Sequence, residues 1–87
     1  MKRTYFCVLS EFYDSGKVKA CMVSREADKL PNNQYRQVPG LAALKLWFLN
    51  VSSAIQLLDE IKKGECSLDD ILQFYSGNQE FIRRTSA

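Results

Sequence analysis

The chain has 87 residues, of which 46% are hydrophobic and 25% are charged. These values are typical of one small globular domain and exclude wholesale disorder. The net charge of +2 is too small to indicate nucleic-acid binding by itself, but the charge is unevenly distributed. Residues 1–50 carry eight Lys or Arg and four Asp or Glu, whereas residues 51–87 carry four and six.

Residues 4–24 are predicted to form a β-hairpin around the turn Asp14-Ser15-Gly16. A three-residue loop places Tyr13 opposite Lys17 and Phe12 opposite Val18. A two-residue loop would set Phe12 against Lys19 and mix the apolar and polar faces, so burial favours the longer loop. One face then carries Phe6, Val8, Phe12, Val18, Ala20 and Met22, and the other carries Tyr5, Cys7, Leu9, Glu11, Tyr13, Lys17, Lys19, Cys21 and Val23.

Residues 25–40 are polar and contain Pro31, Pro39 and Gly40, which predicts a long loop. The apolar run that follows fits either a helix or a strand, and we favour a third strand over residues 44–49 because a hairpin needs further support. Trp47 would then point to the same side as Tyr5 or Tyr13. Asn50 suits the start of a helix over residues 51–63.

A capping box at Ser67-Leu68-Asp69-Asp70 predicts a second helix over residues 68–76, and residues 78–87 form a tail. The predicted fold is one α+β domain spanning residues 1–87. It comprises a three-stranded antiparallel sheet covered on one face by one long and one short C-terminal helix.

The cysteines Cys7, Cys21 and Cys66 are odd in number and lack CxxC spacing, which predicts free thiols in the cytoplasm. The start of the chain lacks the long apolar run of a signal peptide, and the stretch 41–49 is too short to cross a bilayer, so no membrane partner is expected. The chain has no histidine, no Gly-rich phosphate loop and no nucleophile elbow. We therefore expect a protein without enzymatic activity, metal or cofactor.

A family resemblance rests on Tyr5-Phe6-Cys7-Val8, Ser10, Phe12, Asp14, Gly16, Val18 and Ala20, followed by Trp47-Phe48 and Ala54. This pattern resembles that of small proteins encoded on phages and other mobile elements of gut-type bacteria, over about residues 4–63. It departs from theirs at Leu46 and Leu49, where that family tends to be acidic. The resemblance implies a hairpin, a Pro-containing loop, a Trp-Phe strand end and an amphipathic helix, in a protein that works inside a bacterial host cell. It implies no activity.

The second hairpin face combines aromatic and charged residues, as protein interfaces do. The predicted function is therefore a protein-binding module, an inhibitor of a host defence complex such as a CRISPR effector. A second copy of the chain is another partner for this face. The predicted contact residues are Tyr5, Leu9, Glu11, Tyr13, Lys17, Lys19, Arg25, Tyr35 and Arg36.

Two alternatives remain open at this level. An acidic group could imitate nucleic-acid phosphates and occupy the basic groove of a nuclease; its members are Asp59, Glu60, Glu65, Asp69 and Asp70. The other alternative is a small nucleic-acid-binding protein, in which Tyr13 or Tyr35 stacks on bases. Its cations would be Lys17, Lys19, Arg25, Lys29, Arg36, Arg83 and Arg84.

Overall fold

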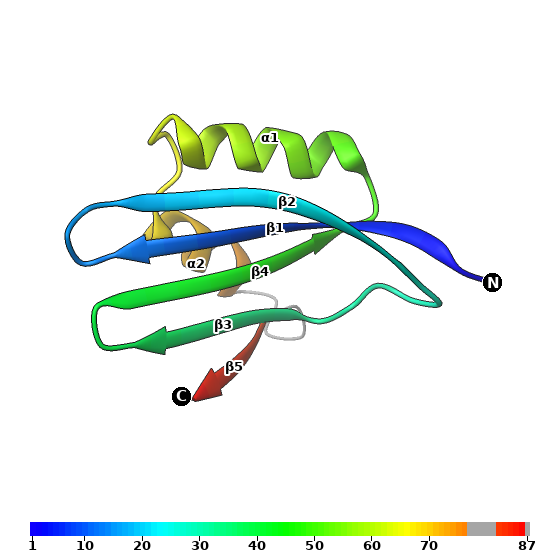
Figure 1. Cartoon of the computed structure of the whole chain (residues 1–87), viewed down its shortest axis with the longest axis horizontal. Coiled ribbons are helices and arrows are strands. Elements are labelled where there is room, and N and C mark those ends of the chain that lie inside the picture. The colour runs from blue at the N-terminus through cyan, green and yellow to red at the C-terminus, as the bar shows by residue number, and fades with distance from the viewer. Residues whose placement is uncertain (77–81, 87) are drawn as a thin grey trace.

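The computed structural model describes residues 1–76 and 82–86, and its strands form one sheet in the order β2-β1-β4-β3-β5 (Figure 1). The elements in chain order are β1 (Arg3–Tyr13), β2 (Val18–Ala27), β3 (Asn33–Val38), β4 (Leu41–Phe48), α1 (Val51–Lys62), α2 (Leu68–Ser76) and β5 (Ile82–Ser86). Strands β1 to β4 pair antiparallel, and β5 pairs parallel with β3 at the edge of the sheet. The architecture is α+β, as predicted.

The β1–β2 hairpin has the predicted register. Phe12 lies opposite Val18, and the amide of Tyr13 donates a 2.9 Å hydrogen bond to the carbonyl of Lys17. The amide of Gly16 donates to the carbonyl of Tyr13 at 2.9 Å, and Gly16 has a φ of 92°. A side chain is strained at that φ, so glycine at this position fixes the three-residue loop.

The prediction of a loop over residues 25–40 is wrong. Strand β2 continues to Ala27, and residues Asn33–Val38 form β3, which pairs with β4. Pro39 and Gly40 make the tight turn between them, where Val38 lies opposite Leu41 and Gly40 has a φ of 83°. Residues 25–40 therefore supply the end of one strand, a short connection and a second hairpin.

The sheet consequently has four antiparallel strands where three were predicted. The strand expected over residues 44–49 is present and begins earlier, at Leu41, so the helical alternative for this run is wrong. Residues 82–86, predicted as part of a tail, form β5, whereas residues 78–81 and 87 of that tail lie outside the described residues. The two hairpins are tied at their turns, because the amide of Asp14 donates a 3.1 Å hydrogen bond to the carbonyl of Gly40.

Both helices begin with the predicted caps. The Oδ1 atom of Asn50 accepts a 2.8 Å hydrogen bond from the amide of Ser52, which satisfies one free N–H of the first turn of α1. Ser67 and Asp70 form the predicted capping box at α2, with reciprocal hydrogen bonds of 3.0 and 3.2 Å. Helix α1 has 12 residues, an ordinary length for a globular domain, so the prediction of a long helix is wrong.

The core lies between one face of the sheet and the two helices. Val8, Leu44 and Leu46 project from β1 and β4 and are fully buried against residues of both helices. The helical contributors to this core are Ala54, Ile61 and Ile71. We call this side the covered face; it is the face on which Phe6, Val8, Phe12, Val18, Ala20 and Met22 were expected.

Candidate functional site

The other side of the sheet, which we call the open face, has no described helix over it. In Figure 1, α2 lies behind the strands and neither helix passes in front of them. The strand registers place on this face the odd-numbered residues of β1, β2 and β4 and the even-numbered residues of β3. Successive side chains of a strand alternate between faces, so the registers alone define this set.

The centre of the open face is apolar. Leu9 on β1 lies opposite Cys21 on β2, and Ala43 on β4 lies one row further along the sheet. A shallow hollow of about 500 Å³ is lined by these side chains together with Glu11, Lys19 and Lys45, and by Ser10, Ala20 and Leu44 of the same strands. Because Ser10 and Leu44 are each only 1% exposed, the accessible wall of the hollow comes from the open-face side chains.

Exposed cations surround this apolar centre on both sides. Over β1 to β4 and the turn before β2, the open face carries Arg3, Lys17, Lys19, Arg25, Arg36 and Lys45, against the single carboxylate of Glu11. Lys19 and Arg25 lie on β2 and Lys17 directly precedes it, whereas Lys45 and Arg36 lie on β4 and β3. The face is thus strongly basic in a chain whose net charge is only +2.

The aromatic rings of the open face are already in contact with cations. The guanidinium of Arg25 lies over the ring of Trp47, and the ammonium of Lys19 lies over the ring of Tyr13, each 5.8 Å from the ring centroid. The hydroxyl of Tyr13 also donates to Oε1 of Glu11 at 3.3 Å. Tyr5 is only 6% exposed. These rings therefore present little free surface.

Most of the predicted contact residues do share this face. They are Tyr5, Leu9, Glu11, Tyr13, Lys17, Lys19, Arg25 and Arg36. The expectation that Tyr35 belongs to a contact loop is wrong, since Tyr35 lies in β3 on the covered face and is 4% exposed, with its hydroxyl donating to Gln37 at 3.1 Å. Tyr35 and Arg36 are neighbours in one strand and so point to opposite faces.

Sequence reasoning missed Lys45 and Ala43. Both follow from the alternation Ala43-Lys45-Trp47 once β4 is known to begin at Leu41, because all three then share the face of Trp47. The predicted direction of Trp47 is confirmed, since it lies opposite Cys7.

The acidic group lies elsewhere, on and between the helices. Asp59 forms an exposed ion pair with Lys63 at 2.9 Å, and Glu60 accepts a 3.3 Å hydrogen bond from Gln56. Asp70 is engaged in the cap of α2, and the hydrogen bonds from Ser67 lower the pKa of its carboxyl. The carboxylates therefore do not form one surface with the open face.

The cysteines are free thiols. Burial raises the pKa of the Cys7 thiol to about 11. Burial, together with the negative charges of Asp70 and Glu60, also raises the pKa of Cys66. Both thiols are therefore protonated at neutral pH and are poor nucleophiles. Across residues 1–76 and 82–86, no group of three or more acidic or cysteine side chains is placed to hold a metal ion.

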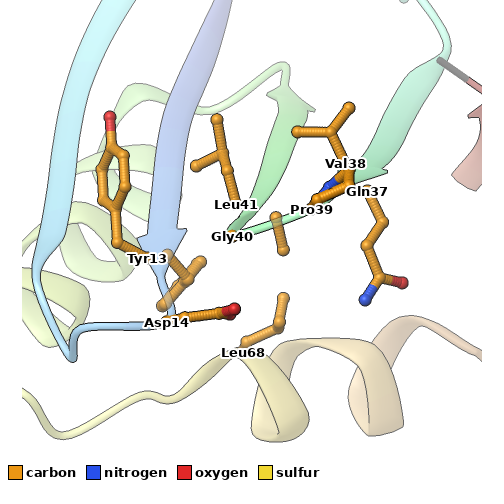
Figure 2. A pocket seen from close by; sticks show the side chains of 10 residues that line it. Tyr13, Asp14, Gln37, Val38, Pro39, Gly40, Leu41 and Leu68 are labelled. Carbon is orange, nitrogen blue, oxygen red and sulfur yellow. The ribbon is translucent and has the colours of Figure 1, made fainter.

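A second hollow lies where the two hairpin turns meet the start of α2. Figure 2 shows this space, of about 560 Å³, with Asp14 and Gln37 extending toward it from opposite sides and Leu68 at the start of α2. Phe12 and Ala42 of the covered face also line it. The helices therefore leave the turn end of the covered face partly uncovered.

Comparisons of the chain with protein-family models, curated proteins and solved structures found no match. Neither described helix combines the length and apolar character needed to cross a membrane.

Proposed function

We propose that this protein is a non-enzymatic binding module that docks another protein on the open face of its sheet. The observation that carries the proposal is the arrangement of this face, in which an apolar hollow lined by Leu9, Cys21 and Ala43 is bordered by exposed cations. Protein interfaces share this plan of an apolar centre and a charged rim.

The apolar side chains of this face extend beyond the hollow. Val23 is 43% exposed, although it lies in the middle of a strand. Cys21, which is also exposed, continues this apolar surface along β2. Contiguous apolar surface of this kind on a small protein is typical of an interaction site.

The test is capture of partners from a bacterial lysate by the immobilised protein, with Leu9→Asp as the disrupting variant. A charge in the hollow should abolish capture, because it would be buried without a partner at the interface. Ile55→Asp is the matched control, since Ile55 is a 50% exposed apolar residue on α1, away from the open face, and should leave capture intact.

Lys45→Glu provides a second disrupting variant that leaves the hollow's apolar lining unchanged, in case Leu9→Asp does not fold. If Leu9→Asp and Lys45→Glu both fold and both retain capture, the open face is not the docking surface. The resemblance to mobile-element proteins makes a host defence complex, such as a CRISPR effector, the first purified partner to try.

Nucleic acid is the second candidate ligand, and the observation that favours it is the excess of six cations over one carboxylate on this face. Single-stranded nucleic acid binds by stacking its bases on exposed aromatic rings, however. Here Trp47 and Tyr13 already contact cations and Tyr5 is buried, which favours a protein partner. Loss of capture on nuclease treatment, with steep salt dependence, would support nucleic acid instead.

A further inference from the structure

We infer that the occupant of the open face is an acidic amphipathic helix of the partner protein. This inference rests on the proposed function and specifies the chemistry of the partner. The partner helix lies along the strands and carries a row of Asp or Glu on each side of an apolar stripe.

The charge pattern of the face supports this occupant. The accessible apolar residues of the face are Leu9 on β1, Cys21 and Val23 on β2 and Ala43 on β4, since Cys7 and Tyr5 are only 0% and 6% exposed. On β2, Lys19 precedes and Arg25 follows the apolar pair Cys21 and Val23, and on the other side of Leu9 lie Lys45 on β4 and Arg36 on β3. A complementary element must therefore carry apolar residues in its middle and negative charge on both flanks.

The dimensions agree with a helix. An α-helix with its side chains is about 10–12 Å across, and neighbouring strands lie about 4.8 Å apart. One helix above β1 would therefore reach from β2 to β4, which are the strands that carry Lys19 and Lys45. The acidic flanks of such a helix would meet these two rows of cations.

The opposite side of the same sheet shows this kind of packing within the molecule. Helix α1 contacts β1, β2 and β4 on the covered face and buries Ala54 and Ile61 there. A partner helix on the open face would give the sheet a helical layer on each side, a common way for sheets to bury both faces.

A second copy of the chain fits the face less well. Joining two open faces would bring together two surfaces that each carry six cations and one carboxylate. Like charges brought together at an interface oppose association. Self-association through this face is therefore an outcome that the test must detect, and not the one we expect.

The experiment is a selection of 20-residue random peptides, displayed on yeast, against the full-length protein. A parallel selection uses the double variant Lys19→Glu/Lys45→Glu, with its fold verified by denaturation. Wild type should enrich peptides with apolar residues at i, i+3, i+4 and i+7 flanked by Asp or Glu. The selection against the double variant should not enrich these peptides.

Trp47 is the only tryptophan of the chain and lies on the open face, so its fluorescence reports binding directly. Titration with a selected synthetic peptide should shift this emission. The affinity should fall at least tenfold in the double variant. The same peptide with its flanking Glu changed to Lys should prefer the double variant over wild type.

Several results would overturn the inference. Enrichment of basic peptides, of extended peptides with alternating apolar residues, or of no peptides would each do so. Dimerisation of the protein that shifts Trp47 emission without peptide would point to a second copy, and a shift with single-stranded oligonucleotide alone would point to nucleic acid. If lysate capture still depends on Leu9 while the selected peptides are not helical, the proposed function is retained. The inference that the partner presents an acidic helix is then rejected.

Discussion

The two faces of the sheet remove their apolar side chains from water in different ways. On the covered face, Val8 and Leu46 are fully buried beneath the helices. On the open face, Cys7 is also fully buried, although no described helix lies over it. Its neighbours across the sheet are Val23 and Trp47, and Arg25 covers the ring of Trp47. Side chains of the open face therefore shield one another.

The proposed function assigns different roles to the two faces. The covered face packs over most of its length against helices whose caps and apolar stripes follow from their own sequences, so it supplies stability. The open face keeps apolar residues half-exposed among cations, and under the proposed function these residues meet the partner. Stability and binding should consequently respond to different substitutions.

The largest expected effect is on the covered face. Leu46→Ala should lower the free energy of unfolding by about 2–5 kcal/mol, because a fully buried leucine leaves a cavity. Leu9→Ala is the matched substitution on the half-buried open face and should cost about 1 kcal/mol or less. Urea denaturation measures both. Equal losses would show that the open face is covered in solution.

The second expected effect is a pH dependence of the free energy of unfolding that reports the burial of Cys7 on the open face. The unfolded Cys7 thiol ionises around its ordinary pKa of 9.0, whereas the folded thiol keeps its proton up to a pKa of about 11. Between these pKa values, ionisation of the thiol stabilises the unfolded state. The free energy of unfolding should therefore fall as the pH rises from 9 to 11, and Cys7 should not change it below pH 9. The two pKa values limit the loss to roughly 2–3 kcal/mol.

The measurement is the difference between wild type and Cys7→Ala, because the comparison removes the contribution of every other group. The stability of wild type should fall more steeply than that of Cys7→Ala between pH 9 and 11. Parallel curves would mean that Cys7 is accessible to water on the open face.

The third prediction concerns the strand that carries Trp47 to the open face. The Oδ1 atom of Asn33, which is 5% exposed, accepts a 2.6 Å hydrogen bond from the amide of Trp47. Asn33→Ala should cost about 1–3 kcal/mol, because it leaves that amide without its partner. Asn32→Ala, at the exposed neighbouring position, is the control and should be nearly silent.

Asn33 also illustrates what the sequence does and does not reveal. The first hairpin, α1 and the cap of α2 were predictable because Asp14-Ser15-Gly16, Asn50 and the Ser67–Asp70 box act locally. Strand β3 was not predictable, since NQYRQV is polar and lies between prolines, and pairing with β4 stabilises it as a strand. The burial of Tyr35 was missed for the same reason, and the placement of Lys45 followed only from the true start of β4.

The fourth prediction concerns a polar atom in the covered core. The hydroxyl of Ser10 is buried on the covered face, and among the described residues it has no hydrogen-bond partner. Ser10→Ala should therefore leave stability unchanged or raise it by about 1 kcal/mol, because burying an unpaired hydroxyl costs free energy. Thermal denaturation checks this against Ser24→Ala, an exposed position on β2. A clear loss of stability in Ser10→Ala would indicate a bound water or a partner for the hydroxyl.

The smallest effect on stability should accompany a large effect on binding. Lys45 is exposed on the open face, and exposed substitutions usually change the free energy of unfolding by less than about 0.5 kcal/mol. Lys45→Glu should therefore leave the urea midpoint nearly unchanged. It should nevertheless abolish partner capture, because it places a carboxylate where the partner presents its own negative charge. Lys29→Glu is the matched control, with the same change in net charge at an exposed position between β2 and β3, and it should retain capture. Loss of capture in both variants would mean that the partner senses overall charge, and the distinction between the two faces would then concern stability alone.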